Sequence, residues 1–267
     1  MSLEITILGC GSSGGVPRVA QGWGACDPTN PKNRRRRCAI LLRQTNATDE
    51  TTQVLVDMGA DLRAQLIDAG VNRLDGILLT HSHADHTHGI DDLRPMVQDM
   101  KARIDLYMDE FTSGIVRNAF RYIFDTPPGS GYPPLLSEHR ITEGQKLNVN
   151  GPGGPIEALP FLLNHGEIDA LGFRFGNAAY TPDLNAIPEK SIAALEGLDL
   201  WIVDALRYTR HPSHFCLDET LSWIERLRPK HAVLTNLHTD LDFEELRTHL
   251  PPNVEPAFDG MVISTGV

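Results

Sequence analysis

Residues 80–89 read THSHADHTHG and place four histidines and one aspartate within ten positions. The stretch directly follows the apolar run GILL, which predicts a buried strand that ends where the histidines begin. On a tight turn, residues two positions apart can point the same way. We therefore expect His81 and His83 to bind one metal ion while Asp85 and His86 face a second. Imidazoles and carboxylates suit zinc, manganese or iron.

Three later segments repeat this arrangement. His165, Asp183 and His238 each come shortly after an apolar run that predicts a strand. Strands fix position while the loops that follow them tolerate polar side chains, so functional groups gather at strand ends in α/β proteins. We expect these residues to converge with the histidine turn on one site, where the Asp183 carboxylate can bridge two ions.

Composition limits the class of protein. The 267 residues are 41% hydrophobic, which predicts one folded domain over residues 1–267. A formal net charge of -11 repels polyanions and disfavours a large nucleic acid as partner. No apolar stretch approaches the length of a membrane span, and the four cysteines form no C-x-x-C pair. These features predict a cytoplasmic protein without a membrane segment.

Short apolar runs alternate with polar helical stretches, a pattern typical of mixed α/β layers. Strands are expected at 3–8, 38–42, 53–57, 76–80, 104–108, 146–149, 156–163, 171–175, 178–181, 198–204, 232–236 and 261–264. Helices are expected at 61–69, 110–123, 189–195, 217–228 and 243–250.

The motifs THSHADH, NHG, YTPD and NLH together resemble those of the metallo-β-lactamase-fold hydrolases. The segments LGCGSSGGVP, WGAC, NPKNRRRRC and HPSH resemble more closely the phosphodiesterases of the carbon-phosphorus lyase pathway, which are related to tRNA 3′-processing endonucleases. The resemblance implies an αββα sandwich, in which two mixed sheets are flanked by helices and carry a dinuclear metal site.

The resemblance also divides the ligands between two ions. It implies His81, His83 and His165 for the first ion, Asp85, His86 and His238 for the second, and Asp183 as the bridge. It further implies His214 as the residue that contacts the substrate phosphate.

The residues predict a hydrolysis. Two divalent ions, manganese or zinc, about 3.5 to 4 Å apart would lower the pKa of a shared water, so that hydroxide attacks phosphorus in line. Asp85 and Asp183 are the expected catalytic carboxylates, and His214 is expected to assist the leaving group. Ser12 and Ser13 lie in a glycine-rich turn that could offer backbone N–H groups to a phosphate.

Other polar residues have structural or open interpretations. Asp57 ends a predicted strand and is expected to support the histidine turn by a hydrogen bond. The run of arginines at 34–37 is equally consistent with a solvated face and with a rim that steers anions. We predict no structural zinc, because only Cys26 is present of the cysteines that the resembling enzymes use and Leu241 stands where they have a histidine.

The prediction is a metal-dependent phosphodiesterase for a small substrate, a ribose cyclic phosphate or a 2′,3′-cyclic nucleotide. A ribonuclease similar to tRNA 3′-endonucleases is the nearest alternative. Thioesterases and lactonases of the same fold share the seven ligands, so the metal motif does not exclude them. A metal-bound or nucleotide-binding module without activity is a further alternative. The resemblance also suggests a homodimer.

Overall fold

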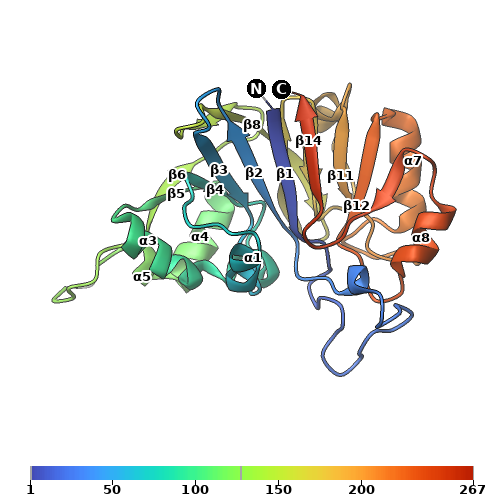
Figure 1. Ribbon diagram of the computed structural model, residues 1–267, viewed down its shortest axis with the longest axis horizontal. Helices are drawn as coiled ribbons and strands as arrows, with labels where there is room; N and C mark the ends of the chain where they lie inside the picture. The colour runs from blue at the N-terminus through green and yellow to red at the C-terminus, as the bar shows by residue number, and fades with distance from the viewer. Residues whose placement is uncertain (1, 127, 267) are drawn as a thin grey trace.

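Two seven-stranded sheets pack face to face in the computed structural model, which describes residues 2–126 and 128–266 (Figure 1). The first sheet has the order β14 (Val262–Gly266), β1 (Ser2–Gly9), β2 (Ala39–Thr45), β3 (Thr51–Val56), β4 (Gly76–Leu78), β5 (Ile104–Met108) and β6 (Leu136–Arg140). The pairs from β14 to β3 are antiparallel and those from β3 to β6 are parallel, so the sheet is mixed.

The second sheet is mixed as well. Its order is β13 (Val254–Pro256), β12 (His231–Thr235), β11 (Leu200–Asp204), β10 (Ala178–Thr181), β9 (Ile168–Phe175), β8 (Ile156–His165) and β7 (Leu147–Val149). Here the pairs from β10 to β13 are parallel, whereas those from β7 to β10 are antiparallel.

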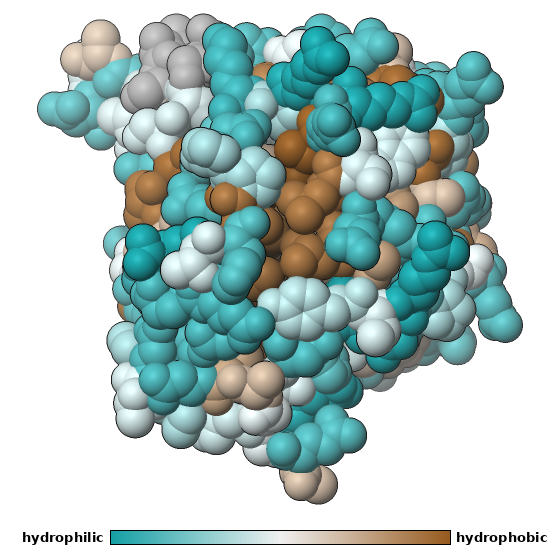
Figure 2. Space-filling view, turned by 90° about the vertical axis from the view of Figure 1, so that its right-hand side faces the viewer, coloured by the Kyte–Doolittle hydropathy of each residue, from teal (hydrophilic) through white to brown (hydrophobic). Residues whose placement is uncertain are grey.

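Helices cover the outer faces of both sheets (Figure 1). The helices in the first half of the chain are η1 (Pro31–Asn33) in the loop after β1, α1 (Leu62–Asp68), α2 (Ala84–Thr87), η2 (Ile90–Leu93), α3 (Arg94–Met100), α4 (Glu110–Ala119) and α5 (Arg121–Phe124). In the second half they are α6 (Glu189–Ile192), η3 (Ala193–Leu195), α7 (Leu217–Leu227) and α8 (Phe243–His249). Figure 2 shows the side that carries α7 and α8 in Figure 1, where an apolar hollow is ringed by hydrophilic side chains.

Successive side chains of a strand point to opposite faces of its sheet, and this alternation explains the layers. In β2, Ile40 and Leu42 belong to the apolar cluster between the sheets, whereas Leu41 belongs to the cluster under the helices of the first sheet. In β12, Val233 faces the other sheet and Leu234 faces the helices of the second sheet. Strands buried on both faces read as continuous apolar runs, which is why the sequence marks them. The predicted αββα sandwich is therefore confirmed.

The structure corrects several element boundaries. The helix predicted at 110–123 is two helices, because Phe120 between them has a non-helical φ of -125° and ψ of 40°. Strands β6 and β13 were not predicted. β6 reads LSEHR with a single apolar residue, and β13 has three residues and ends in proline. Both lie at sheet edges, where burial of both faces is not required.

The histidine turn differs in form from the prediction. β4 ends at Leu78, two residues earlier than expected, and the turn itself contains the helical turn α2.

The two chain termini lie at one end of the sandwich, and the loop that follows β1 lies at the opposite end (Figure 1). In the part of the chain that the structure describes, no helix is long and apolar enough to cross a membrane.

Candidate metal centre

Three imidazoles from two sheets meet at the strand ends. The Nε2 atoms of His81 and His165 lie 3.0 and 3.1 Å from Nδ1 of His83. His81 follows β4 of the first sheet, and His165 ends β8 of the second. The convergence of ring nitrogens on one point is the arrangement in which imidazole lone pairs bind a single ion.

Hydrogen bonds behind two of these rings set their orientation. The Nδ1 atom of His81 lies 3.0 Å from the Thr80 hydroxyl, and Nδ1 of His165 lies 2.7 Å from the backbone carbonyl of Ser213. A proton on Nδ1 satisfies each contact and leaves Nε2 with a lone pair facing the centre. Burial lowers the pKa of both His81 and His165, so they are held in the neutral form that binds metal.

A second group forms around His86. Its Nε2 atom lies 3.5 Å from Asp85 Oδ2 and 3.3 Å from Asp183 Oδ1, while its Nδ1–H donates to the buried Asp57 at 2.8 Å. Asp57 also accepts hydrogen bonds from the backbone N–H and the hydroxyl of Thr80, each at 2.9 Å. Burial opposes charge on His86, but the carboxylates of Asp183, Asp57 and Asp85 outweigh it and raise the pKa of His86.

The Asp183 carboxylate lies between the two groups. Its Oδ2 atom is 3.9 Å from His81 Nε2 and 3.6 Å from His165 Nε2, whereas Oδ1 faces His86. Within the described residues this buried Oδ1 has no hydrogen-bond partner. A buried oxygen without a donor and lone pairs of neighbouring imidazoles have the chemistry of a divalent cation site. The residues present therefore fit the metal ions that the sequence predicts.

His214 lies beside this centre with a carboxylate behind it. Its ring is 4.6 Å from that of His165, and its Nδ1 atom is 2.9 Å from Oδ2 of the fully buried Asp204. Burial disfavours the charged imidazole, but Asp204 outweighs burial and raises the pKa of His214 to about 9. For Asp204, burial disfavours the charged carboxylate and therefore raises its pKa, to about 7.

The structure does not bring every expected ligand into the cluster. Among the described residues, the ligand groups whose atoms lie within 4.8 Å of one another are His81, His83 and His165; His81, His86 and Asp183; and His165, Asp183 and His214. Asp85 lies outside these groups but adjoins them, with its Oδ2 atom 3.5 Å from Nε2 of His86. The Nε2 atom of His238 instead accepts a hydrogen bond from Arg18, and its Nδ1 atom faces Asp240 Oδ1 at 3.2 Å.

The glycine-rich turn after β1 reaches the loop that carries His238. Ser12 donates its backbone N–H to the Leu237 carbonyl at 3.3 Å, and its buried hydroxyl has no partner among the described residues. Ser13 is exposed, and its carbonyl accepts from Arg37 Nε at 3.3 Å. Ser12 therefore adjoins a proposed ligand, whereas Ser13 lies on the surface of the turn.

Two histidines without a predicted role have different places. The ring centroid of His88 lies 5.3 Å from that of Phe120, so His88 makes an aromatic packing contact. His211 lies with its ring 5.1 Å from the His214 ring and therefore borders the candidate site.

The sequence analysis did not identify two further residues at the site, Asp204 and Arg18. Asp204 ends β11, so the strand-end rule that selected Asp183 could have found it, whereas nothing in the sequence marks Arg18.

The four arginines of the run differ in burial and in partners: Arg34 is exposed, Arg36 and Arg37 are partly buried, and Arg35 is buried. Arg36 pairs with Asp259 and Asp68, and Arg37 pairs with Asp61. The remaining two arginines also have partners within the fold: the Arg34 guanidinium lies 5.2 Å from the Trp23 ring, and Arg35 is 2% exposed.

Arg35 binds the segment in which the resembling enzymes hold a structural zinc. It donates to the carbonyls of His238 and Leu241 at 3.2 and 2.7 Å and contacts the Cys26 sulfur at 3.8 Å. The Cys26 thiol also contacts the carbonyls of Thr239 and Leu241, each at 3.5 Å. Hydrogen bonds to a buried guanidinium thus join the N-terminal loop to the loop after His238.

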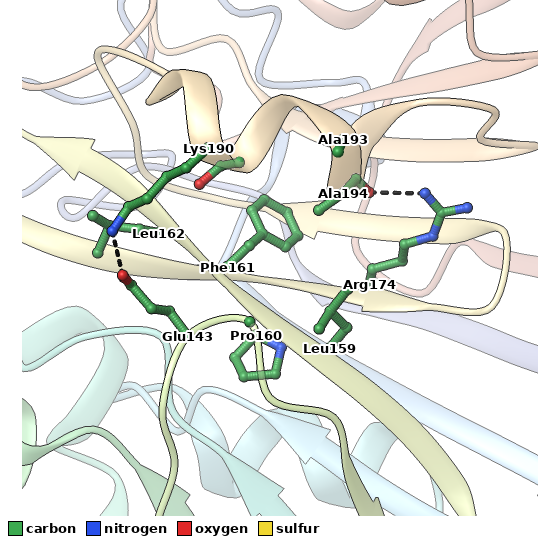
Figure 3. A pocket seen from close by; sticks show the side chains of 11 residues that line it. Glu143, Leu159, Pro160, Phe161, Leu162, Arg174, Lys190, Ala193 and Ala194 are labelled. Carbon is green, nitrogen blue, oxygen red and sulfur yellow. Dashed lines mark hydrogen bonds and ion pairs between the residues drawn. The ribbon is translucent and has the colours of Figure 1, made fainter.

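A separate cavity of about 460 Å³ lies along β8, β9 and α6 (Figure 3). Its floor is apolar and includes Phe161, and its charged groups are paired: Lys190 with Glu143, and Arg174 with the carbonyl of Ala194 at 3.0 Å. Because its polar groups satisfy one another, this cavity offers no convergent ligands for a metal or a phosphate.

The sandwich, with imidazoles and carboxylates gathered at its strand ends, defines the class as the metallo-β-lactamase-fold hydrolases. The family described as the beta-lactamase superfamily domain matches residues 52–236, and the chain belongs to that family.

Similar proteins narrow the class. A crystal structure of a diphosphatase from the PhnP family superposes with a TM-score of 0.88 at 34% identity, over 99% of this chain and 98% of that one. An octanoyltransferase from Porphyromonas gingivalis is 30% identical over 97% of this chain and 51% of its own length. A ribonuclease Z from Bradyrhizobium sp. strain ORS 278 is 32% identical over 54% of this chain and 45% of its own length.

The chain thus spans about half the length of the curated relatives it matches. The PhnP-family and ribonuclease Z matches confirm the resemblance to the phosphodiesterase group and to the tRNA-processing enzymes.

Proposed function

We propose that this chain is a dinuclear metal-dependent phosphodiesterase for a small phosphodiester, a ribose cyclic phosphate such as a 2′,3′-cyclic nucleotide. The observation that carries the proposal is the position of Asp183, whose two oxygens face different histidine groups. A carboxylate placed in this way suits a bridge between two ions. The single-domain organisation, a homodimer and a cytoplasmic location stay predictions of the sequence.

The residues proposed to hold the ions are those of the two groups. The first position would use His81, His83 and His165, the second Asp85, His86 and His238, and Asp183 would serve both. Manganese or zinc bound there would lower the pKa of a water and neutralise charge that develops on phosphoryl oxygens.

His214 is the proposed proton donor. In the hydrolysis a P–O bond to water forms, the P–O bond to the ribose oxygen breaks, and that oxygen must receive a proton. The Asp204 carboxylate holds Nδ1 of His214, which leaves Nε2–H as the group that can donate. The raised pKa keeps the imidazole protonated at neutral pH. Ser12 and Ser13 are proposed to line the phosphate position from the glycine-rich turn.

Charge and the similar proteins support a small phosphorus-containing substrate. The net charge of -11 disfavours a large RNA, which argues against the ribonuclease alternative. The similarity to a PhnP-family diphosphatase extends over nearly both whole chains and favours phosphorus over a thioester or lactone carbon. It also makes a diphosphate linkage the second candidate substrate.

The test compares substrate classes on one preparation. Manganese-loaded protein is incubated in parallel with 2′,3′-cyclic AMP, a dinucleoside diphosphate, a thioester, a lactone and a tRNA precursor. The reactions are repeated after chelation and again after manganese is restored. The expected result is cleavage of the cyclic phosphate that chelation abolishes and manganese restores.

Each other outcome assigns a different function. Cleavage of the diphosphate alone would move the substrate to the second candidate and leave the metal centre intact. Cleavage of the thioester, the lactone or the tRNA would overturn the proposed substrate class. Activity that survives complete metal removal would overturn the metal mechanism itself.

A further inference from the structure

Arg18 binds a ring nitrogen of His238, the residue proposed above as a ligand of the second metal ion. Its Nη1 atom donates to Nε2 of His238, across 220 positions of the chain. The backbone of Arg18 is held in place, because its N–H and carbonyl form two 2.8 Å hydrogen bonds with Gly22. The contact therefore comes from a fixed loop and ends on a proposed ligand.

The hydrogen bond and a metal ion exclude each other at this atom. The Nδ1 atom of His238 lies 3.2 Å from both Asp240 Oδ1 and the Thr239 hydroxyl. A carboxylate oxygen only accepts, whereas a hydroxyl can do either, so a ring proton on Nδ1 satisfies both contacts. Nε2 then has one lone pair in the ring plane, and the Arg18 N–H uses it. An ion can bind His238 only after the guanidinium leaves, and the positive guanidinium would also repel a cation placed beside it.

The guanidinium is free to pair elsewhere. Within residues 2–126 and 128–266, no carboxylate lies within 4.0 Å of Arg18, and His238 is its only side-chain hydrogen-bond partner. The side chain lies over Gly14, where a Cβ atom would come within 2.4 Å of Nε. The missing side chain at Gly14 makes room for Arg18, whose flexible stem can move while its backbone stays in place.

A phosphate group has the chemistry to release Arg18. Guanidinium groups bind phosphate through two parallel N–H bonds, and an anion between the guanidinium and a metal ion removes their mutual repulsion. We propose that Arg18 competes with the second metal ion for the Nε2 lone pair of His238, and that a substrate phosphate releases it by binding its guanidinium. This inference rests on the second metal position of the proposed function.

The competition predicts a measurable coupling between metal and anion. Manganese is titrated by calorimetry into the metal-free parent protein, Arg18→Ala and Arg18→Lys, with and without inorganic phosphate, and bound metal is counted by mass spectrometry. Arg121→Ala is the control, because it removes the same charge from a side chain that is 84% exposed on α5.

The parent should bind its second ion more weakly than its first, and phosphate should tighten that second binding. Arg18→Ala should bind the second ion about tenfold more tightly without phosphate, and phosphate should then have a smaller effect. Arg18→Lys should fall between the two, and Arg121→Ala should behave as the parent.

The titration distinguishes two results that would overturn the competition. If the parent binds two ions and Arg18→Ala binds the second with the same affinity, the competition is overturned while the two-metal site stands. If the parent and Arg18→Ala both hold a single ion at saturating manganese, the two-metal site of the proposed function is overturned, and the competition with it.

Discussion

His86 donates its Nδ1–H to the carboxylate of Asp57 at 2.8 Å, a contact between residues 29 positions apart. The bond turns the other ring nitrogen of His86 toward Asp85 and Asp183. The carboxylate behind the ring fixes the tautomer of His86 and increases its basicity. Loss of such a hydrogen-bond partner of a metal-binding histidine typically weakens metal binding strongly.

Asp57→Asn should therefore weaken metal binding by about 10- to 100-fold without unfolding the protein. Asp57 has a φ of 66°, a conformation that asparagine tolerates, so the backbone should keep its path. Calorimetric manganese titration measures the effect, with Asp92→Asn, a change at an exposed residue of η2, as the control. Equal affinities in Asp57→Asn and the parent would contradict the supporting role of Asp57.

His165→Ala should empty one metal position. His165 Nε2 faces both His83 and Asp183, so its removal takes one nitrogen from the first group. Mass-spectrometric metal counting on purified protein is the measurement, and Glu167→Ala, an exposed neighbour two positions away, is the control. A His165→Ala protein with the metal content of the parent would exclude His165 as a ligand.

His214→Ala should keep both ions and slow phosphodiester cleavage by about 10²- to 10⁴-fold, because it removes a proton donor. The loss should shrink with bis-p-nitrophenyl phosphate, whose leaving group needs no proton. A loss of equal size on both substrates would indicate a binding role for His214. An undiminished rate on the cyclic phosphate would remove it from the mechanism.

Asp242 should make stability depend on acid pH. Its carboxylate caps α8 through the N–H groups of Glu244 and Glu245 and accepts from Asn33 at 2.6 Å. Partial burial opposes its ionisation, but hydrogen bonds, first among them that from the Asp27 N–H, hold the pKa of Asp242 below its ordinary value. A carboxyl with a lowered folded pKa stabilises at neutral pH, and this contribution is lost as the pH falls.

Asp242→Ala should accordingly lower the free energy of unfolding by about 1 kcal/mol at pH 7, as expected for a lost helix cap. The difference from the parent should shrink toward pH 3. Urea unfolding at both pH values measures it. A difference that stays constant between the two pH values would show that the ionised carboxylate is not the stabilising form.

Local pattern explains which elements could be predicted. The predicted ranges of β5 and β10 agree with the structure at both ends. β5 alternates buried apolar residues with half-buried ones between Arg103 and Asp109, and β10 is a fully buried stretch between Asn177 and Pro182. β6 escaped detection because an edge strand needs little apolar surface. Its position depends on hydrogen bonds to β5, which only the folded sheet supplies.

At the candidate site, too, some features could be predicted from the sequence and others could not. The residue types of the ligands and their places after strands are local features, so the sequence alone determined them. The apolar runs likewise determined mixed α/β layers, and the family resemblance of the motifs implied the αββα sandwich. Only the tertiary structure decided which atom meets which. It turns His86 toward Asp183, places Asp204 behind His214, and brings Arg18 to the nitrogen of His238. Such partners are chosen by the packing of two sheets against each other, and no local propensity encodes them.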